Sequence, residues 1–326
     1  MINHIEELKI GLTSTPKHIN RKFSCDKRGD EIFEELMNCS TYYVPRSELE
    51  IFKIHKTKML NLFTQQESSF NLIDLGVGSG VKSRILIEEL LSKEIDFTFY
   101  PLDISQNAVQ NVTQNLVHDF PDLKVVPIVA DFFEGIKEIN SLTQNRNVYL
   151  FLGGSSGNIF AKERVKFYSQ LAKQLSKDDL FLTGFDLIKK PSVILDAYAN
   201  GNSKIVSELF VNALQRMNQE LNANFDVSKF KFHFHYNPRN GRGNFDFVCT
   251  EKMQVEIQKM NMALNLDKFE VINLGLSDKF SLNQIENLAT QTGFEIVENL
   301  FDTKEYFVNS VWRKRESITN YKLLMC

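Results

Sequence analysis

Between Asn71 and Leu187 the sequence alternates short apolar runs of strand length with longer segments of helical periodicity. The expected strands are Leu72–Leu75, Phe97–Leu102, Val125–Val129, Val148–Leu152 and Leu180–Phe185. The expected helices are Val81–Ser92, Gln106–His118, Phe133–Ile139 and Ala161–Leu175. Almost entirely apolar strands that alternate with helices are typical of a parallel sheet covered on both faces. The pattern therefore predicts an α/β, doubly wound domain.

The pattern changes after Pro191, where a long amphipathic helix is expected over Lys204–Leu221. Beyond it, the turn sequence Asn237-Pro238-Arg239-Asn240-Gly241 between two strand-like segments predicts an antiparallel hairpin. The other expected elements are strands Phe230–Tyr236, Asn244–Thr250, Val255–Ile257 and Phe269–Leu274, helix Leu282–Thr290, and closing strands Phe294–Leu300 and Tyr306–Trp312. The closing strands would form an antiparallel edge, so a second α+β domain is expected to be inserted before the sheet is complete.

The charge balance disfavours a nucleic-acid substrate. The 326 residues carry 38 Lys and Arg against 41 Asp and Glu, which provides no basic field for phosphates. The longest apolar runs fall far short of the roughly 20 residues of a membrane helix, and Glu6 and Glu7 interrupt the segment where a signal peptide would be apolar. The four cysteines form no CxxC pair, so neither a zinc site nor a disulfide framework is expected. We expect a cytoplasmic monomer with no metal and no membrane or nucleic-acid partner.

A glycine-rich loop follows the first strand directly. The segment Asp74-Leu75-Gly76-Val77-Gly78-Ser79-Gly80 leads into the first helix. Glycines there permit positive φ and close approach of a ligand, while the start of the helix offers unpaired N–H groups. A dinucleotide fingerprint would place its third glycine at Val81, so this pattern is not met. The loop favours S-adenosylmethionine over a nicotinamide dinucleotide.

Two acidic residues stand at the ends of the next two strands. Asp103 could bind both ribose hydroxyls of a nucleoside, and Asp131 could accept from the adenine amino group with Phe132 near the ring. Taken singly, each aspartate is better explained as a helix cap or turn residue. Because ligands of such sheets bind outside the carboxyl ends of the strands, all three loops are expected on one rim. Together they favour a cofactor site.

Besides the glycine loop, the sequence contains four motifs in a specific order. They are Tyr42-Tyr43, Gly157-Asn158, Asp186-Leu187-Ile188-Lys189-Lys190-Pro191 and Ala197-Tyr198. In this order they resemble the histidine-specific, S-adenosylmethionine-dependent Nα-methyltransferases of ergothioneine biosynthesis. The likeness extends from about Lys22 to Lys314.

The resemblance implies a Rossmann-like, class I methyltransferase sheet over residues 47–188 and 279–326, with a substrate domain over 1–46 and 189–278. The implied cofactor contacts are Gly76, Gly78, Lys82, Asp103, Asp131 and Phe132. For the acceptor amino acid, the resemblance implies that Asn158 and Tyr198 bind the α-amino and α-carboxylate groups, with Tyr42 beside the side chain. A turn for Asn158 and a helix-face aromatic for Tyr198 are what the residues alone suggest.

The chain departs from this family where the acceptor side chain would bind. The family motif Glu-x-Ser-x-Lys-Phe corresponds to Gly275-Leu276-Ser277-Asp278-Lys279-Phe280, which keeps Ser277 and replaces the acid with Gly275. A pocket-lining methionine of the family aligns with Asp246, and Cys25 stands where the family has a tyrosine. These exchanges suggest a side chain that differs from histidine. Alternatively, a register shift of one residue would turn Asp246 away from the pocket.

Methyl transfer to an amine needs positioning more than a strong base. Asn158 would orient the amine lone pair, and the proton could leave through water or Tyr42. The resemblance implies transfer to the α-amino group of a free amino acid, up to a trimethylated betaine. The alternatives are an indole-type or other small amine as acceptor, or a catalytically silent S-adenosylmethionine-binding protein. Retention of Asn158, Tyr198 and Tyr42 argues against the silent protein.

Overall fold

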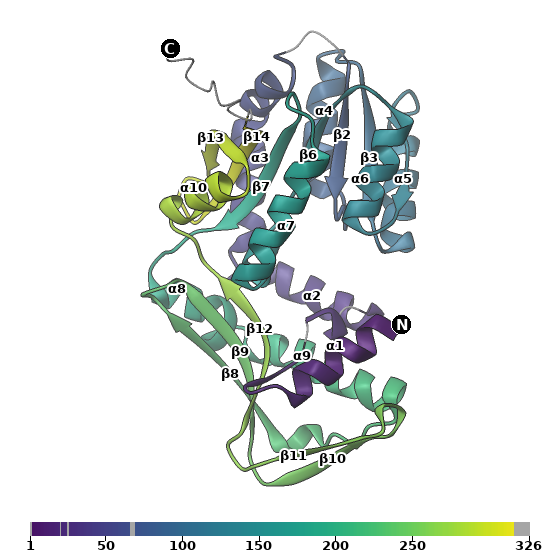
Figure 1. The fold of residues 1–326 in the computed structure, drawn as a ribbon. Helices are drawn as coiled ribbons and strands as arrows, with labels where there is room; N and C mark the ends of the chain where they lie inside the picture. The colour runs from purple at the N-terminus through teal and green to yellow at the C-terminus, as the bar shows by residue number, and fades with distance from the viewer. Residues whose placement is uncertain (1, 20, 25, 66–68, 316–326) are drawn as a thin grey trace, which may run out of the picture. The chain divides into compact units, whose positions relative to one another are not determined.

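The chain divides into two compact units in the computed structural model (Figure 1), which describes residues 2–19, 21–24, 26–65 and 69–315. The large unit comprises Arg46–Leu187 and Phe280–Cys326, and the small unit Met1–Pro45 and Ile188–Lys279. Each of the three boundaries lies one residue from the position expected from the sequence. Residue 25, where the sequence has a cysteine in place of the family's tyrosine, lies outside the described residues.

An eight-stranded sheet forms the centre of the large unit. Its order is β13-β14-β7-β6-β2-β3-β4, with β5 also paired to β3. Strands β2 to β7 pair in parallel, and β14 runs antiparallel to both β7 and β13. The strands are β2 (Phe70–Leu75), β3 (Phe97–Asp103), β4 (Lys124–Val125), β5 (Ile128–Val129), β6 (Arg146–Phe151), β7 (Leu180–Asp186), β13 (Phe294–Phe301) and β14 (Phe307–Lys314). The predicted doubly wound sheet with an antiparallel edge is confirmed.

Helices cover this sheet on both faces (Figure 1). Helices α6, α7 and α10 pack together on one side; ion pairs join α3 to α4 and α4 to α5. The helices are α3 (Val44–Phe63), α4 (Val81–Ser92), α5 (Gln106–Asp119), α6 (Phe132–Leu142), α7 (Ala161–Gln174) and α10 (Leu282–Gln291). Aromatic rings fill the core: Trp312, fully buried, stacks on Phe185 at 5.7 Å between ring centroids and contacts Tyr168 at 5.1 Å. Much of the phenylalanine content thus serves packing.

The small unit is an α+β structure. Its sheet has the order β1-β12-β9-β8, in which only β1 pairs in parallel, and β10 and β11 form a separate hairpin. The strands are β1 (Lys17–His18), β8 (Phe230–Asn237), β9 (Arg242–Cys249), β10 (Met253–Ile257), β11 (Met262–Leu266) and β12 (Val271–Asp278). The helices are α1 (Ile2–Thr13), η1 (Arg21–Ser24), α2 (Lys27–Asn38), α8 (Pro191–Leu195), η3 (Asp196–Asn200), α9 (Ser203–Leu221), η4 (Val227–Lys229) and η5 (Gln258–Met260).

Several elements differ from the sequence-based prediction. The run Val125–Val129 forms two short strands because Pro127 cannot donate to a sheet ladder. Strand β11 was not predicted, since its five residues alternate too briefly for a clear pattern, and no element was predicted before Asn71, where α1, α2 and α3 lie. Their tertiary packing decides their structure more than local periodicity does.

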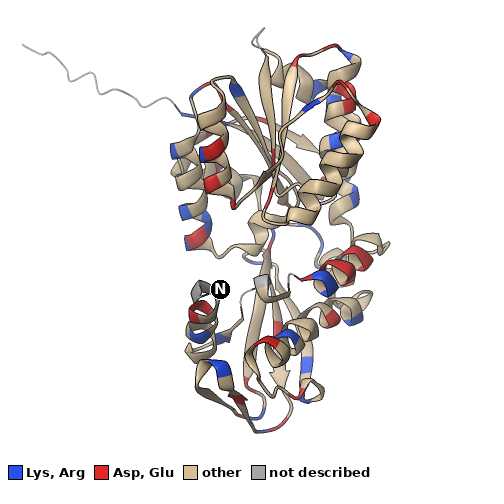
Figure 2. Ribbon diagram, turned by 90° about the vertical axis from the view of Figure 1, so that its right-hand side faces the viewer, with Lys and Arg blue, Asp and Glu red and all other residues tan. Residues whose placement is uncertain are grey.

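Charged residues of both signs are intermixed along the helices of each unit, as Figure 2 shows. None of the described helices is both long enough and apolar enough to cross a membrane.

Gly80 sets the entry of the glycine loop into α4. Its φ is +68°, and a Cβ added there would lie 2.9 Å from Cγ1 of Val112 on α5. We expect Gly80→Ala to lower the free energy of unfolding by about 1–2 kcal/mol through the left-handed backbone alone, with a further loss from the clash. Urea unfolding followed by the fluorescence of Trp312, the single tryptophan, measures this. Gly293→Ala is the control, because Gly293 has φ +89° but an added Cβ would lie 3.8 Å from Ala172; equal losses would contradict the role of Val112.

Candidate functional site

The order of strands in the large unit reverses between β2 and β6. From β2 the chain continues through α4 to β3 on one side, and from β6 it continues through α7 to β7 on the other. At such a switch point the loops at the carboxyl ends of the two strands leave a crevice where ligands bind. Here these loops are the glycine loop after β2 and the segment Leu152–Asn158 after β6.

The glycine loop turns sharply at three glycines. Gly76, Gly78 and Gly80 have φ values of +85°, +52° and +68°, a region that favours glycine. The N–H of Gly76 donates to the carbonyl of Leu102 at 2.8 Å, which ties the loop to the end of β3. Helix α4 starts without a side-chain cap, so N–H groups of its first turn lack intrahelical acceptors. The loop therefore offers donors and a positive helix end to an anion.

Asp103 joins two loops at the rim. Its Oδ2 accepts from the N–H of Gly78 at 3.2 Å, and its Oδ1 accepts from the N–H of Ser105 at 2.9 Å. Each carboxylate oxygen can accept a second hydrogen bond, so this fixed, half-buried carboxylate retains capacity for a hydroxyl of a ligand.

Asp131 and Phe132 lie at the start of α6. Asp131 caps this helix through Oδ1, which accepts from the N–H groups of Phe133 at 3.0 Å and Glu134 at 3.2 Å. The ring of Phe132 lies over the glycine loop, 3.6 Å from the position that a Cβ on Gly76 would take. The capping role considered for Asp131 is thus present, and the aromatic wall expected from Phe132 stands beside Gly76.

Lys82 is held by a carboxylate that the sequence pattern did not single out. Its Nζ lies 2.5 Å from Oε2 of Glu48 on α3. The Glu48 side chain is 1% exposed and also accepts from the N–H of Gly153, at 2.7 Å to Oε1 and 3.0 Å to Oε2. The sequence signal that could have identified Glu48 is the presence of a glutamate among the apolar positions of an amphipathic helix.

Asp74 ends the buried strand that precedes the loop. It is 2% exposed, and its Oδ1 has no hydrogen-bond partner among the described residues. Burial raises the pKa of Asp74 to about 6; the charges of Glu48 and Asp103 also raise this pKa, while a hydrogen bond with Ser83 and the charge of Lys82 lower it. A buried acceptor left without a donor is costly, so a cationic or N–H-bearing ligand group would be favourable here. The loop, the ribose-type acceptor Asp103 and this unsatisfied acid fit S-adenosylmethionine.

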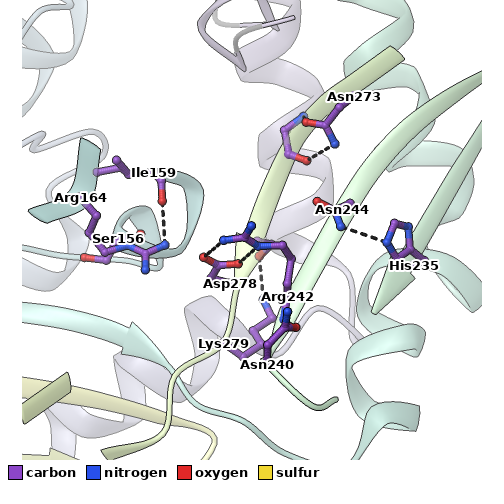
Figure 3. A network of polar contacts seen from close by, with 12 residues as sticks. Ser156, Ile159, Arg164, His235, Asn240, Arg242, Asn244, Asn273, Asp278 and Lys279 are labelled. Carbon is purple, nitrogen blue, oxygen red and sulfur yellow. Dashed lines mark hydrogen bonds and ion pairs between the residues drawn. The ribbon is translucent and has the colours of Figure 1, made fainter. Parts of the chain in front are cut away.

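Asn158 lies in the short helix η2 (Ser155–Asn158), which follows β6 in the large unit. Arg164 of α7 spans this helix: its Nε donates to the carbonyl of Ser156 at 2.8 Å and its Nη2 to that of Ile159 at 2.7 Å (Figure 3). The hydroxyl of Ser156 is hydrogen-bonded to that of Tyr168. Both chain neighbours of the Gly157–Asn158 pair are therefore fixed by buried side chains, which holds the backbone of Asn158 in place.

Tyr198, Ser277 and Lys279 form a buried cluster in the small unit. Nζ of Lys279 donates to Oγ of Ser277 at 2.7 Å and to the hydroxyl of Tyr198 at 3.1 Å, and these two hydroxyls are 3.3 Å apart. Tyr198 lies in η3, a π-helical turn, the kind of irregular turn often found at functional sites. Its ring contacts those of Tyr42, Phe234 and Phe245, with centroids 5.6, 5.0 and 5.4 Å away. The cluster combines two hydroxyls and an ammonium with an aromatic surround.

The strand register separates Asp246 from the other residues expected near the acceptor. Phe245 pairs with Phe234 and Gly275, and Ser277 pairs with Gly243 two residues away, so these residues share the sheet face that carries Tyr198. Asp246 points to the opposite face, where Oδ1 accepts from Nδ2 of Asn273 at 2.9 Å and Oδ2 lies 3.3 Å from Nδ1 of His235. Figure 3 shows His235 bound to Asn244 on that face. Phe245, and not Asp246, lies on the face that carries Tyr198.

Gly275 lies at a break in the sheet. The register between β12 and β9 shifts between Asn273 and Gly275, and Gly275 has φ +141°. The side chain of Asn273 spans this bulge, accepting from the N–H of Gly275 at 3.2 Å and donating to its carbonyl at 3.3 Å. Because other residues rarely adopt this backbone conformation, the missing acid and the local backbone geometry are linked.

The end of β12 is anchored by an ion pair. Arg242 of β9 donates through Nε and Nη2 to both carboxylate oxygens of Asp278, at 2.9 and 3.1 Å (Figure 3). Asp278 lies directly between Ser277 and Lys279, so this two-point contact fixes the backbone that carries both. Within the described residues, no group of three or more His, Cys, Asp or Glu side chains could hold a metal ion.

Comparisons with known proteins point to one family. Residues 5–314 match the family described as "Histidine-specific methyltransferase, SAM-dependent". The histidine N-alpha-methyltransferase of Mycolicibacterium smegmatis is 24% identical over 274 residues, covering 84% of this chain and 83% of the relative. The 4-dimethylallyltryptophan N-methyltransferase of Penicillium roqueforti is 24% identical over 332 residues, covering 98% and 93%. A solved structure, the 1,6-didemethyltoxoflavin-N1-methyltransferase of Burkholderia thailandensis, covers 89% of each chain with 9% identity and a TM-score of 0.42.

The sheet, its switch point and the cofactor loop define an S-adenosylmethionine-dependent methyltransferase of the class I, Rossmann-like type. More specifically, the chain belongs to the histidine-specific methyltransferase family. The resemblance, the cofactor and the enzyme class that the sequence indicated are confirmed, and the protein is an N-methyltransferase.

The raised pKa of Asp74 predicts a dependence of stability on pH. Folded Asp74 keeps its proton up to about pH 6, whereas the unfolded residue loses it near 3.8. Because the folded state then binds more protons between these values, Asp74 lowers the free energy of unfolding as pH rises through this window. Asp74→Asn removes the ionisation, so its free energy of unfolding relative to wild type should rise by about 2 kcal/mol between pH 4 and 7, as urea unfolding at each pH would measure.

Asp119→Asn is a control of opposite sign for this experiment. Hydrogen bonds from His118 and Arg84 lower the pKa of Asp119 from 3.8, so this variant should lose stability relative to wild type as pH rises toward 3.8 and should change little between pH 4 and 7. A difference between Asp74→Asn and wild type that does not change with pH would contradict a raised pKa at Asp74.

Proposed function

We propose that the protein transfers methyl groups from S-adenosylmethionine to the α-amino group of a free amino acid. The cofactor supplies an electrophilic methyl group on a sulfonium centre. The observation that carries the proposal is the buried cluster of Tyr198, Ser277 and Lys279, whose hydroxyl and ammonium hydrogens suit a carboxylate. The histidine N-alpha-methyltransferase of Mycolicibacterium smegmatis supports an amino-acid acceptor.

The remaining contacts follow from this assignment. Glycines 76 and 78 with the N–H groups of α4, Lys82, Asp103, Asp131 and Phe132 bind the cofactor. The amide oxygen of Asn158 accepts from the acceptor's α-amino group and orients its lone pair, while the phenol of Tyr42 borders the acceptor and can pass a proton to solvent. Aromatic rings near the amine also tolerate the cationic, partly methylated products.

The acceptor's side chain differs from imidazole in this proposal. The acid of the family motif is replaced by Gly275 in its bulge, and Phe245 and Phe234 line the sheet face next to Tyr198. An apolar aromatic side chain gains from burial against these rings, whereas an imidazole N–H would lose its carboxylate partner. The match to a 4-dimethylallyltryptophan N-methyltransferase over nearly the whole chain supports an indole-type side chain.

An aromatic amine without a carboxylate is the second candidate acceptor. The same aromatic face favours it, but the Tyr198–Ser277–Lys279 cluster would then have no partner on the acceptor. Tryptophan and tryptamine, which differ only in the carboxylate, separate the two candidates.

The test combines binding and turnover. We expect S-adenosylhomocysteine to bind in a calorimetric titration, and methyl transfer in the presence of S-adenosylmethionine to be at least tenfold faster with an aromatic amino acid than with its decarboxylated amine. The panel contains the twenty amino acids, tryptamine and histamine, and mass spectrometry of the products counts the methyl groups. Faster methylation of tryptamine would favour the second candidate, and histidine as the best acceptor would refute the assignment of the side chain.

Neighbouring residues on opposite sheet faces test the acceptor contacts. We expect Phe245→Leu to change the ratio of kcat/KM between two aromatic acceptors by about tenfold, a loss of the order of one aromatic contact. The matched variant Asp246→Asn changes the adjacent residue on the other face and should leave this ratio within about twofold. Steady-state kinetics with both acceptors measure the ratios. A larger effect from Asp246→Asn would show that the acceptor does not bind on the face that carries Phe245.

A further inference from the structure

Glu48 joins three segments of the large unit through one buried carboxylate. It extends from α3 and takes the ammonium of Lys82 on α4 at 2.5 Å. It also accepts from the N–H of Gly153, the second residue after β6, at 2.7 and 3.0 Å. Both oxygens are therefore engaged, and the side chain is 1% exposed. A buried carboxylate that lost these donors would be strongly destabilising.

The surrounding backbone leaves room for this carboxylate. A Cβ added to Gly184 of β7 would lie 2.9 Å from Oε1 of Glu48 and 2.7 Å from the carbonyl oxygen of Gly153. Position 184 must therefore lack a side chain for Glu48 to reach Gly153. Four segments contribute to the arrangement, so it is a built site and not a surface ion pair.

The groups that Glu48 holds are those that the reaction uses. A lysine side chain has several rotatable bonds, and fixing its ammonium before the ligand arrives lowers the entropy that binding costs. Gly153 opens the loop that leads to Asn158, five residues further along the chain. Glu48 thus holds a residue assigned to the cofactor and the start of the loop that carries a residue assigned to the acceptor. Its negative charge also offsets the positive charge of Lys82 close to the buried Asp74.

We propose that Glu48 is a positioning residue of the methyl-transfer reaction, which holds the Lys82 ammonium and the loop from Gly153 to Asn158 in the geometry that binds the cofactor. This inference rests on the proposed function, in which Lys82 contacts S-adenosylmethionine. Glu48 acts through Lys82 and Gly153 and is not assigned a contact of its own with either substrate.

The main experiment compares Glu48→Gln with Glu89→Gln. Glu89 of α4 pairs with Lys56 of α3 at 2.7 Å, so it joins the same two helices away from the glycine loop. We expect Glu48→Gln to weaken binding of S-adenosylhomocysteine at least tenfold and to raise the KM for S-adenosylmethionine more than it lowers kcat. Glu89→Gln should change both by less than twofold. Equal effects of the two variants would overturn the proposal, because they would reflect only the bridging of α3 and α4.

A double-variant cycle separates this inference from the function on which it rests. Lys82→Met alone should weaken binding of S-adenosylhomocysteine, and Glu48→Gln added to it should cost less than threefold more, because Lys82 is the group that Glu48 positions. A full additional tenfold loss in the double variant would overturn the part of the proposal in which Glu48 acts through Lys82. Unchanged binding by Lys82→Met would instead refute the cofactor assignment of Lys82.

The pH dependence of S-adenosylhomocysteine binding distinguishes an electrostatic role of Glu48 from a purely structural one. The charge of Glu48 raises the pKa of Asp74, so Glu48→Gln should shift the acid limb of S-adenosylhomocysteine binding to lower pH. The charged groups that act on Asp74 are Lys82, Glu48 and Asp103, and Asp103→Asn tests the same limb independently.

If Glu48→Gln is poorly folded by circular dichroism, Glu48→Asp retains the charge on a shorter side chain. It should keep the wild-type acid limb yet bind more weakly, and wild-type binding would overturn the need for the full reach of Glu48.

Discussion

The reversal of strand order between β2 and β6 is the constraint on which the rest of the large unit depends. Two parallel strands whose connections leave in opposite directions cannot have their carboxyl ends covered by the same crossover, so the ends stay open. The glycine loop, Lys82 and the segment leading to Asn158 all follow these two strands. Chemistry-bearing residues far apart in the sequence therefore gather at one edge, and the sheet's apolar core below them keeps that edge rigid.

Burial gives this edge its electrostatic character. Asp74 and Glu48 are 2% and 1% exposed, and they lie near a single ammonium, that of Lys82, with Asp103 at the rim. Burial disfavours the charged form of Asp74, and the charges of Glu48 and Asp103 add to this effect, so the pKa of Asp74 is raised to about 6. Glu48 instead takes Lys82 and a backbone N–H. The family's cofactor carries an ammonium and a sulfonium. A site with an excess of carboxylates suits such a cationic ligand better than a neutral site would.

Local sequence signals predicted the elements but not their long-range partners. The alternation of apolar runs and the three glycines sufficed for the sheet and the loop, because each depends on residues close in the sequence. The role of Glu48 was not predicted because its partners, Lys82 and Gly153, lie 34 and 105 positions away in the sequence. The sequence left two faces open for Asp246 because strand alternation reverses with a shift of one residue, and the structure places it on the face opposite Tyr198. No local pattern marks the bulge between Asn273 and Gly275. The cap at Asp131 shows the opposite case, because the helix-cap interpretation of this residue needed only its immediate neighbours in the sequence.

The same bulge connects backbone geometry with acceptor choice. A glutamate at position 275 could pair with an imidazole only from a backbone that tolerates a side chain, and the φ of +141° at Gly275 does not. Changing this one residue back would therefore strain β12 as well as restore a charge, because Asn273 bridges the bulge from both sides. With the acid lost in this way, the sheet face beside Tyr198 presents rings in place of a carboxylate. A face of this kind selects by shape and apolar area, which discriminates among aromatic side chains only modestly, whereas the hydroxyl and ammonium hydrogens of Tyr198, Ser277 and Lys279 discriminate strongly for a carboxylate. With the acceptor proposed above, recognition therefore depends more on the carboxylate and amino group of the amino acid than on its side chain.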